Sequence, residues 1–220
     1  MSERDSILTR IREALRLQAP ARHGRGLPTL VEQRRVLPPV GKSEADWFAL
    51  FAKNATELRA TCKRVQDLGE VTAALCALRD AEGWRRAATH RGPVAAAQAR
   101  ALALPLMVVE DNSEKHALEQ CDVGITECDA LVAQTGTVLV TSRTTGGRAL
   151  TCLPPHHVVL ARRDQLVPDL PAAMQLVQQK FGDDYPSMIS FITGASRTGD
   201  IERILVLGAH GPKKLTIFCY

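Results

Sequence analysis

Residues 188–220 read MISFITGASRTGDIERILVLGAHGPKKLTIFCY, and the rest of the chain is organised around this stretch. The apolar run Met188–Ile192 predicts a buried strand that leads into a loop rich in glycine and hydroxyl side chains. Glycines let successive backbone N–H groups converge, and a guanidinium suits a carboxylate or a phosphate. We therefore interpret this loop as a candidate anion site made of Gly194, Ser196, Arg197, Thr198 and Asp200.

A second strand, Ile204–Leu207, is expected to lead into the tight turn Gly208–Pro212, which would then lie beside the same loop. Within this turn His210 is the candidate acid or base, because histidine side chains exchange protons near neutral pH. The alternative is an ordinary turn, since glycine, serine, threonine, aspartate and proline also build turns without any ligand. For Asp200 the alternatives are orienting the guanidinium and capping a following turn.

The composition describes a globular chain whose front third carries the positive charge. The 220 residues are 45% hydrophobic and 24% charged, which allows one sizeable core. Residues 1–64 hold 13 basic and 7 acidic side chains, net +6, and residues 65–220 hold 15 and 17, net −2. The arginines of the front third recur at helical spacing, so a solvated helix face is favoured over a nucleic-acid surface.

The six cysteines include no C-x-x-C pair, so no zinc ribbon or ferredoxin-type iron–sulfur motif is encoded, and we expect no cofactor within this chain. Reduced thiols in a cytoplasmic protein are the simplest interpretation. The adjacent pair His156 and His157 is poorly spaced to chelate one metal, and we predict no metal site. No apolar run approaches the ~20 residues that span a bilayer.

Helical spacing predicts a first helix with Ile7, Ile11 and Leu15 on one face, followed by a Pro/Gly-rich linker. We predict that residues 1–42 form this extension, which packs on a partner or a second copy of the chain, and that residues 43–220 form one domain. Further helices are expected to begin at Ser43, to end near Gly83, and to span 94–102 and 170–181.

Strands at 86–90 and 106–110 flank the helix over 94–102, which indicates neighbouring parallel strands and an α/β fold. Short β-prone runs at 122–126, 131–134 and 137–142 favour antiparallel or bent pairing. In α/β sheets ligands bind off the carboxyl ends of strands, where we expect loops 134–137, 143–148 and 194–200 to share one edge. Glu127 and Asp129 are interpreted as solvated loop charges.

Four segments resemble signatures of the lactate-utilisation protein C family, the LUD-domain proteins. They are Ala133–Val138, Leu153–His157, Thr193–Glu202 and Leu205–Pro212. The resemblance implies a Rossmann-like mixed sheet with flanking helices, similar to CoA transferases, ribose-phosphate isomerases and folate cyclo-ligases. It also adds Thr135, Gly136 and Thr137 to the candidate ligand residues, although these three also suit an ordinary turn.

Relatives often carry an acidic residue at position 134, and a glutamate is the covalent nucleophile in the CoA-transferase branch. Gln134 has no carboxylate, which counts against thioester-forming catalysis from this position. The resemblance implies a subunit or accessory of a system that oxidises L-lactate to pyruvate, with iron–sulfur clusters on partner proteins. The alternatives are a stand-alone enzyme acting on a phosphorylated, CoA-linked or folate-type substrate, and a scaffold without catalysis.

Overall fold

The computed structural model describes residues 3–16, 39–109, 115–198 and 206–220. The chain divides into two compact units, Met1–Val36 and Leu37–Tyr220. In the first unit helix α1 spans Glu3–Arg16 and leaves Ile7 and Ile11 about half exposed, which confirms the predicted helix. Most of the predicted linker lies outside the described residues, and the boundary after residue 42 stays a prediction.

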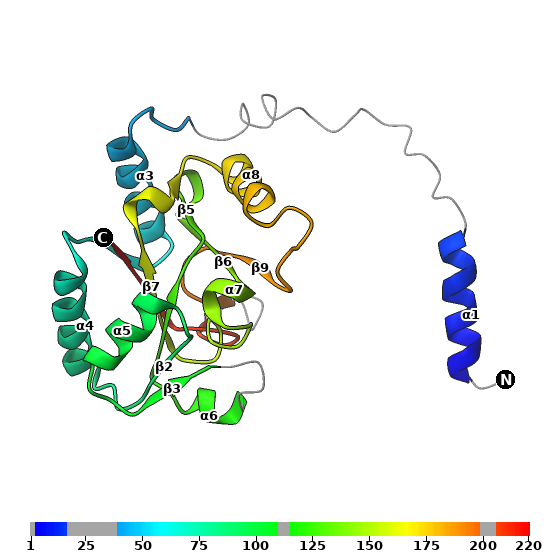
Figure 1. Ribbon diagram of the computed structural model, residues 1–220, viewed down its shortest axis with the longest axis horizontal. Coiled ribbons are helices and arrows are strands. Elements are labelled where there is room, and N and C mark those ends of the chain that lie inside the picture. Colours follow the sequence, from blue (N-terminus) through cyan, green and yellow to red (C-terminus); the bar gives the residue numbers. More distant parts are fainter. Residues whose placement is uncertain (1–2, 17–38, 110–114, 199–205) are drawn as a thin grey trace. The chain divides into compact units, whose positions relative to one another are not determined.

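The second unit is built on a six-stranded sheet in which every neighbouring pair is parallel (Figure 1). In spatial order its strands are β1 (Ala60–Arg64), β12 (Lys214–Cys219), β7 (His156–Ala161), β4 (Val123–Glu127), β2 (Ala87–Thr89) and β3 (Leu106–Val108). The predicted parallel pair of β2 and β3 is confirmed. The run at 122–126 was expected to pair in antiparallel or bent fashion, which is wrong, because β4 lies between two parallel neighbours at the centre of this sheet.

Helices α4 (Leu68–Glu82) and α5 (Pro93–Ala101) cover one face of the parallel sheet (Figure 1). Helix α4 begins after Asp67, whose side chain accepts from Glu70 N, and it ends at Gly83 in the left-handed conformation, as the sequence predicts. Val71 and Leu75 are fully buried against strand residues such as Phe218. Burial of this apolar stripe is what holds the helix on the sheet.

The other face carries helix α3 and a second sheet. Helix α3 (Glu44–Glu57) starts with the predicted capping box, in which Ser43 and Asp46 each bond the other's backbone. The four-stranded sheet has the spatial order β8 (Leu166–Val167), β5 (Ala130–Val132), β6 (Thr137–Thr141) and β9 (Ile189–Ile192). Its outer face packs on α8 (Leu170–Phe181), the helix predicted at these residues.

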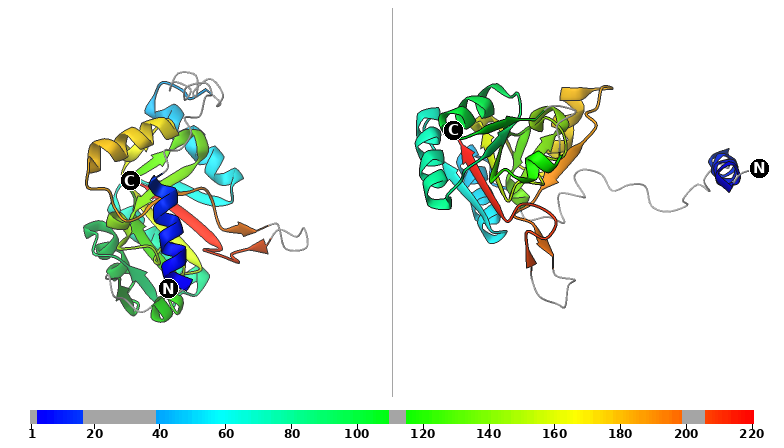
Figure 2. Two further views of the ribbon diagram at one scale, coloured as in Figure 1. Left: turned by 90° about the vertical axis from the view of Figure 1, so that its right-hand side faces the viewer. Right: turned by 90° about the horizontal axis from the view of Figure 1, so that it is seen from below.

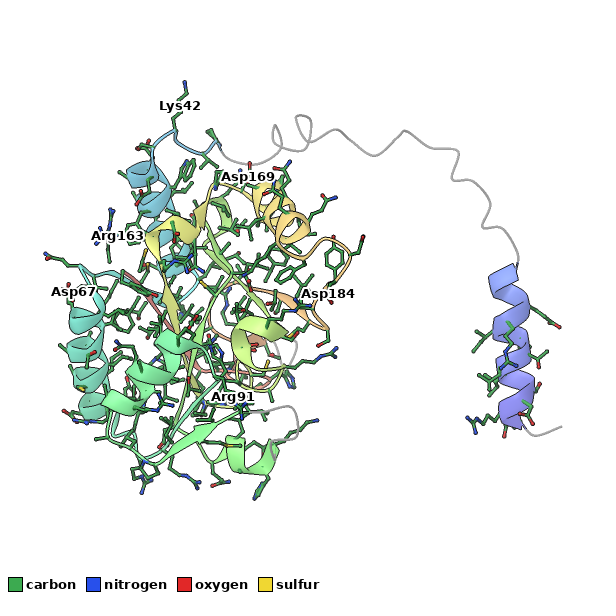
Figure 3. The ribbon with its side chains drawn as sticks, viewed as in Figure 1. Lys42, Asp67, Arg91, Arg163, Asp169 and Asp184 are labelled. Atoms are coloured by element: carbon green, nitrogen blue, oxygen red, sulfur yellow. The ribbon has the colours of Figure 1, made fainter. Side chains whose placement is uncertain are left out.

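Short elements complete the second unit: α6 (Lys115–Glu119), η1 (Ala133–Thr135), α7 (Ser142–Thr145), η2 (Arg163–Gln165), β10 (Arg197–Thr198) and β11 (Val206–Leu207). Strands β10 and β11 pair antiparallel, and Figure 2 shows them extending away from the parallel sheet. Arg163 and Asp67 lie on one side of the unit, after the carboxyl ends of β7 and β1 (Figure 3). There Arg163 Nη2 donates to Val65 O at 2.8 Å and ties the two strand ends together.

Several elements differ from the sequence prediction, and the short elements α6, α7, β8 and β10 were not predicted. Strands β1 and β12 were not predicted, and strand β9 is half-buried rather than buried because it is the edge strand of the second sheet. Each helix in the described parts of the chain is too short or too polar to cross a membrane.

Candidate functional site

The loop 193–198 and the turn 208–212 lie side by side at the base of the β10–β11 hairpin. Ser196 N donates to Pro212 O at 2.9 Å, and Gly208 N donates to Ser196 O at 3.0 Å. Arg197 pairs in register with Leu207. Two segments predicted to share a site are therefore adjacent, and we call residues 193–198 with 208–212 the hairpin base.

The predicted residues of the hairpin base differ in their access to solvent. Arg197 and His210 are exposed, Ser196 and Thr198 are half-buried, and Gly194 is buried. Asp200 lies outside the described residues. Among these predicted residues, the side chains at least partly open to solvent are therefore a guanidinium, an imidazole and two hydroxyls.

The turn Thr135–Thr137 lies beneath helix α3 rather than at an open surface. Gly136 and Thr137 are buried, and the Thr137 hydroxyl lies 2.8 Å from that of Thr193. From α3, Asn54 Nδ2 donates to Ala133 O at 3.0 Å and to Gln134 O at 2.9 Å. The turn is thus joined both to the hairpin base and to the helix above it.

Two glycines of the predicted motifs, Gly136 and Gly194, allow their loops to approach the C-terminal end of α3 closely. A Cβ atom at position 136 would lie 2.5 Å from Ala55 N, and one at position 194 would collide with Leu58 O. Both glycines adopt positive φ, 62° and 82°. Only glycine meets both requirements without strain, so these positions carry packing as well as any ligand role.

The loop 143–148 does not join the other two loops, so the expectation of one shared edge is wrong. Strands β6 and β9 run antiparallel, with Val138 opposite Ile192 and Thr141 opposite Ile189. Loop 143–148 therefore follows the far end of β6, while the turn before β6 and the loop after β9 share the near end. A five-residue strand separates the ends by roughly 13–17 Å.

The hairpin base also lies at the opposite edge of the parallel sheet from the one expected. The turn 208–212 precedes β12, and Lys213 N donates to Pro155 O, just before β7 begins. These are the amino ends of two parallel strands. The predicted site residues therefore gather off the amino edge, because the hairpin is inserted immediately before β12.

The carboxyl edge has its own cluster of polar groups at the topological switch point between β2 and β4. After β2 the chain passes through α5 to β3, which lies on one side of this point, and after β4 it goes on to β7, which lies on the other side. Glu127 Oε1 accepts from Val94 N at 3.0 Å and Ala95 N at 3.1 Å, so it caps α5, whose own cap position is Gly92. A carboxylate at a helix N-terminus is stabilised by the unpaired N–H groups there.

His90, which the sequence analysis did not single out, lies beside this cap and is 3% exposed. Gly92 N lies 3.0 Å from Nδ1, and Glu127 N lies 3.3 Å from Nε2. A neutral imidazole has one acceptor nitrogen, so one of these two contacts forms in each tautomer. Burial lowers the pKa of His90, and the Glu127 carboxylate opposes that shift.

Asp129 is buried, which corrects its interpretation as a solvated loop charge. Its side chain is 0% exposed, its Oδ1 lies 2.5 Å from Lys180 Nζ, and its Oδ2 accepts from Thr144 Oγ1 at 2.7 Å. Glu127 is half-buried in its capping role. Both carboxylates hold elements together at the carboxyl edge, a role that neither local spacing nor charge could have indicated.

His156 and His157 point to opposite faces of the sheet, yet both are buried, because helices and the second sheet cover both faces. The Nε2 atoms lie 2.9 Å from Thr216 Oγ1 and from Thr126 Oγ1 respectively. Burial lowers the pKa of His156 to about 4 and that of His157 to about 3. Within the described residues no three His, Cys, Asp or Glu side chains are grouped to hold a metal ion.

The cysteines are free thiols spread over the second unit, and three of them pack in one apolar cluster. Burial raises the pKa of Cys62 to about 12 and also raises the pKa of Cys128 and Cys219. Because the thiolate is the reactive form, these side chains act as packing groups.

A parallel sheet with helices on one face and a second sheet on the other defines an α/β protein of Rossmann-like architecture. Residues 42–219 match the family model of the LUD domain, and the chain belongs to this family. The crystal structure of a DUF162 family protein from Deinococcus radiodurans superposes with a TM-score of 0.65 at 24% identity, covering 81% of this chain and 99% of that one. That likeness supports the fold.

Several curated relatives are named "Lactate utilization protein C". The chain is 37% identical over 98 residues to the one from Bacillus licheniformis, which is 44% of this chain and 41% of the relative. It is 39% identical over 106 residues to the one from Anoxybacillus flavithermus, 48% and 46% of the two chains. The Bacillus subtilis relative is 37% identical over 107 residues, 48% and 44%. The match thus spans less than half of each of these three relatives.

Proposed function

We propose that this chain acts in lactate utilisation, as an accessory or subunit of an iron–sulfur-dependent system that oxidises L-lactate to pyruvate in the cytoplasm. The observation that carries the proposal is the 37–39% identity to relatives whose names state that process. The absence of any C-x-x-C pair from the sequence supports placing the clusters on partner proteins.

We further propose that the hairpin base binds the anionic ligand. Arg197 is exposed and makes no ion pair with a described residue, so its guanidinium is available to a carboxylate. Ser196 and Thr198, the chain neighbours of Arg197, add hydroxyl donors, and His210 lies in the adjacent turn as the proposed proton donor or acceptor. Gly136 and Gly194 pack against the end of α3, and Thr137 contacts Thr193. Thr135, Gly136, Thr137, Gly194 and Asp200 stay predicted ligand residues.

Deletion of the gene in its source organism should abolish growth on L-lactate as sole carbon source. Growth on glucose should be unaffected, and a plasmid copy should restore growth on lactate. The measurement is the growth rate of the three strains in a background without another lactate dehydrogenase. Normal growth of the deletion strain on lactate would refute the proposed role.

Arg197→Ala should weaken L-lactate or pyruvate binding about tenfold to a hundredfold, the scale of one charge-assisted hydrogen bond. The melting temperature should hardly change, because Arg197 is exposed. Calorimetric titration measures the first quantity and thermal denaturation the second. Arg100→Ala, an exposed arginine at the end of α5, is the control that should leave affinity unchanged.

A large loss of stability in Arg197→Ala would instead make this arginine structural. The same titrations with CoA, ATP and reduced folate address the alternative enzyme. Binding of one of these, with no binding of lactate or pyruvate, would favour a stand-alone enzyme over the proposed accessory.

A further inference from the structure

A groove of about 310 Å³ lies between helix α4 and the part of the parallel sheet formed by the edge strand β1 and its neighbour β12. We call it the amino-edge groove. Thr61 and Thr216 are register partners on adjacent strands, and so are Lys214 and His156, so both pairs face α4. The volume is at the lower end of the range for small-molecule sites.

The groove carries excess positive charge. Lys214 Nζ lies 2.7 Å from Glu82 Oε1 and 2.5 Å from Oε2, so this pair is internally neutralised. Arg59 and Lys63, which also line the groove, make no ion pair with a described residue. Three cations and one carboxylate leave a net charge of +2 around the opening.

Arg59 occupies a backbone conformation that disfavours its side chain. It follows the C-terminal end of α3 with φ at +61°, in the left-handed region, and its N–H donates to Thr56 O at 2.9 Å. Glycine is the usual residue at such a helix end because it adopts this conformation freely. An arginine kept at the wall of a groove, despite that strain, points to a role for its side chain.

The floor of the groove includes the ring of His156, which is 4% exposed and lies 5.1 Å from the Trp84 ring in edge-to-face geometry. Its Nε2 bonds Thr216, and its Nδ1 has no partner among the described residues. Burial lowers the pKa of His156 to about 4, so at neutral pH the floor is uncharged. The positive charge is therefore concentrated at the rim.

We propose that the amino-edge groove binds a small metabolite through a phosphate or carboxylate group, with Arg59 and Lys63 as the charged contacts and Thr61 as a hydroxyl donor. An uncharged body would lie over the floor beside His156. The inference is independent of the proposed lactate function, because no groove residue belongs to the hairpin base.

The test is calorimetric titration of the full chain with inorganic phosphate and, separately, with succinate, at constant ionic strength. Saturable binding of either probe is expected, and the tighter probe identifies the preferred oxyanion. Quenching or enhancement of Trp84 fluorescence in a Trp47→Phe background should follow the same titration curve. Absence of saturable binding of both probes would overturn the proposal.

Four variants distinguish binding in the groove from a nonspecific effect of the protein's charge. Arg59→Gly and Lys63→Gln should each weaken binding about tenfold or more, and Arg59→Gly should also raise the melting temperature because it removes the strained residue. Glu82→Gln should tighten binding severalfold, since it removes the opposing carboxylate. Arg64→Ala, on the opposite face of β1 and paired with Glu44, is the matched control.

Equal weakening by Arg64→Ala, or unchanged affinity in both Arg59→Gly and Lys63→Gln, would refute the site. If Arg59→Gly loses stability, the result for Lys63→Gln decides, because Lys63 lies exposed on an edge strand. Arg197→Ala should leave phosphate and succinate binding at the groove unchanged. A loss in that variant alone would assign the anion to the hairpin base instead.

Discussion

Gly136→Ala is expected to reduce the free energy of unfolding by about 3 kcal/mol or more. The residue has φ at +62°, a conformation that costs an L-residue about 1 kcal/mol or more. The added methyl would also lie 2.5 Å from Ala55 N and 2.8 Å from Asn54 C, and forced overpacking costs about 1–3 kcal/mol. Urea denaturation of the variant and the parent chain measures the difference.

Gly83→Ala is the matched control for this variant. Gly83 has nearly the same φ, +66°, but a Cβ atom there would meet no atom within 4 Å. The free energy of unfolding should therefore fall only by the cost of placing alanine at positive φ, about 1 kcal/mol. Equal losses in the two variants would show that α3 can move away from the turn, and that the close approach does not hold this helix.

Stability should fall steeply between pH 7 and pH 5 because of His156 and His157. Their pKa values in the folded chain, about 4 and about 3, lie below the ordinary value of 6.5. As the pH falls below 6.5 the unfolded chain takes up protons that the folded chain does not. This uptake stabilises the unfolded state and lowers the free energy of unfolding. Each histidine then costs roughly 2 kcal/mol at pH 5, and the loss levels off below the folded pKa.

His157→Gln should remove about half of the loss assigned to His156 and His157, because glutamine can still bond Thr126 but takes up no proton. Urea denaturation of both chains at pH 7 and pH 5 measures the change. His116→Gln is the control for the same substitution at an exposed position, on α6. The same pH dependence in His157→Gln as in the parent would contradict the assignment.

Local signals in the sequence predicted the longer helices α1, α3, α4, α5 and α8 well, but not the short helices α6 and α7. The capping box of Ser43 and Asp46 marked the start of α3, and Gly83 marked the end of α4, because both features act within a few residues. Strand β1 was missed because three of its five residues are exposed and polar, so it lacks an apolar run. Such a pattern is typical of an edge strand, which β1 is. Strand β12 was missed although its buried run Leu215–Cys219 is a local strand signal.

The candidate site was predicted only in part. The adjacency of Ser196 with the turn at 208–212 followed from two strands with a short connection, a local arrangement. The position of loop 143–148 depended on whether β9 pairs with β6 in parallel or antiparallel fashion, and no short motif encodes that choice. The contact of buried Asp129 with Lys180, 51 residues further on, could not be predicted for the same reason.

By itself the sequence determined the α/β class, the helix ends, the family likeness and the glycine-rich hairpin base, because each depends on residues close together in the chain or on a recognisable motif. Only the tertiary structure decided which sheet edge each loop occupies, that Gly136 and Gly194 support α3, and that Arg59 borders a charged groove. These depend on strand order and strand direction, which are set by burying the faces of both sheets together rather than by any single segment.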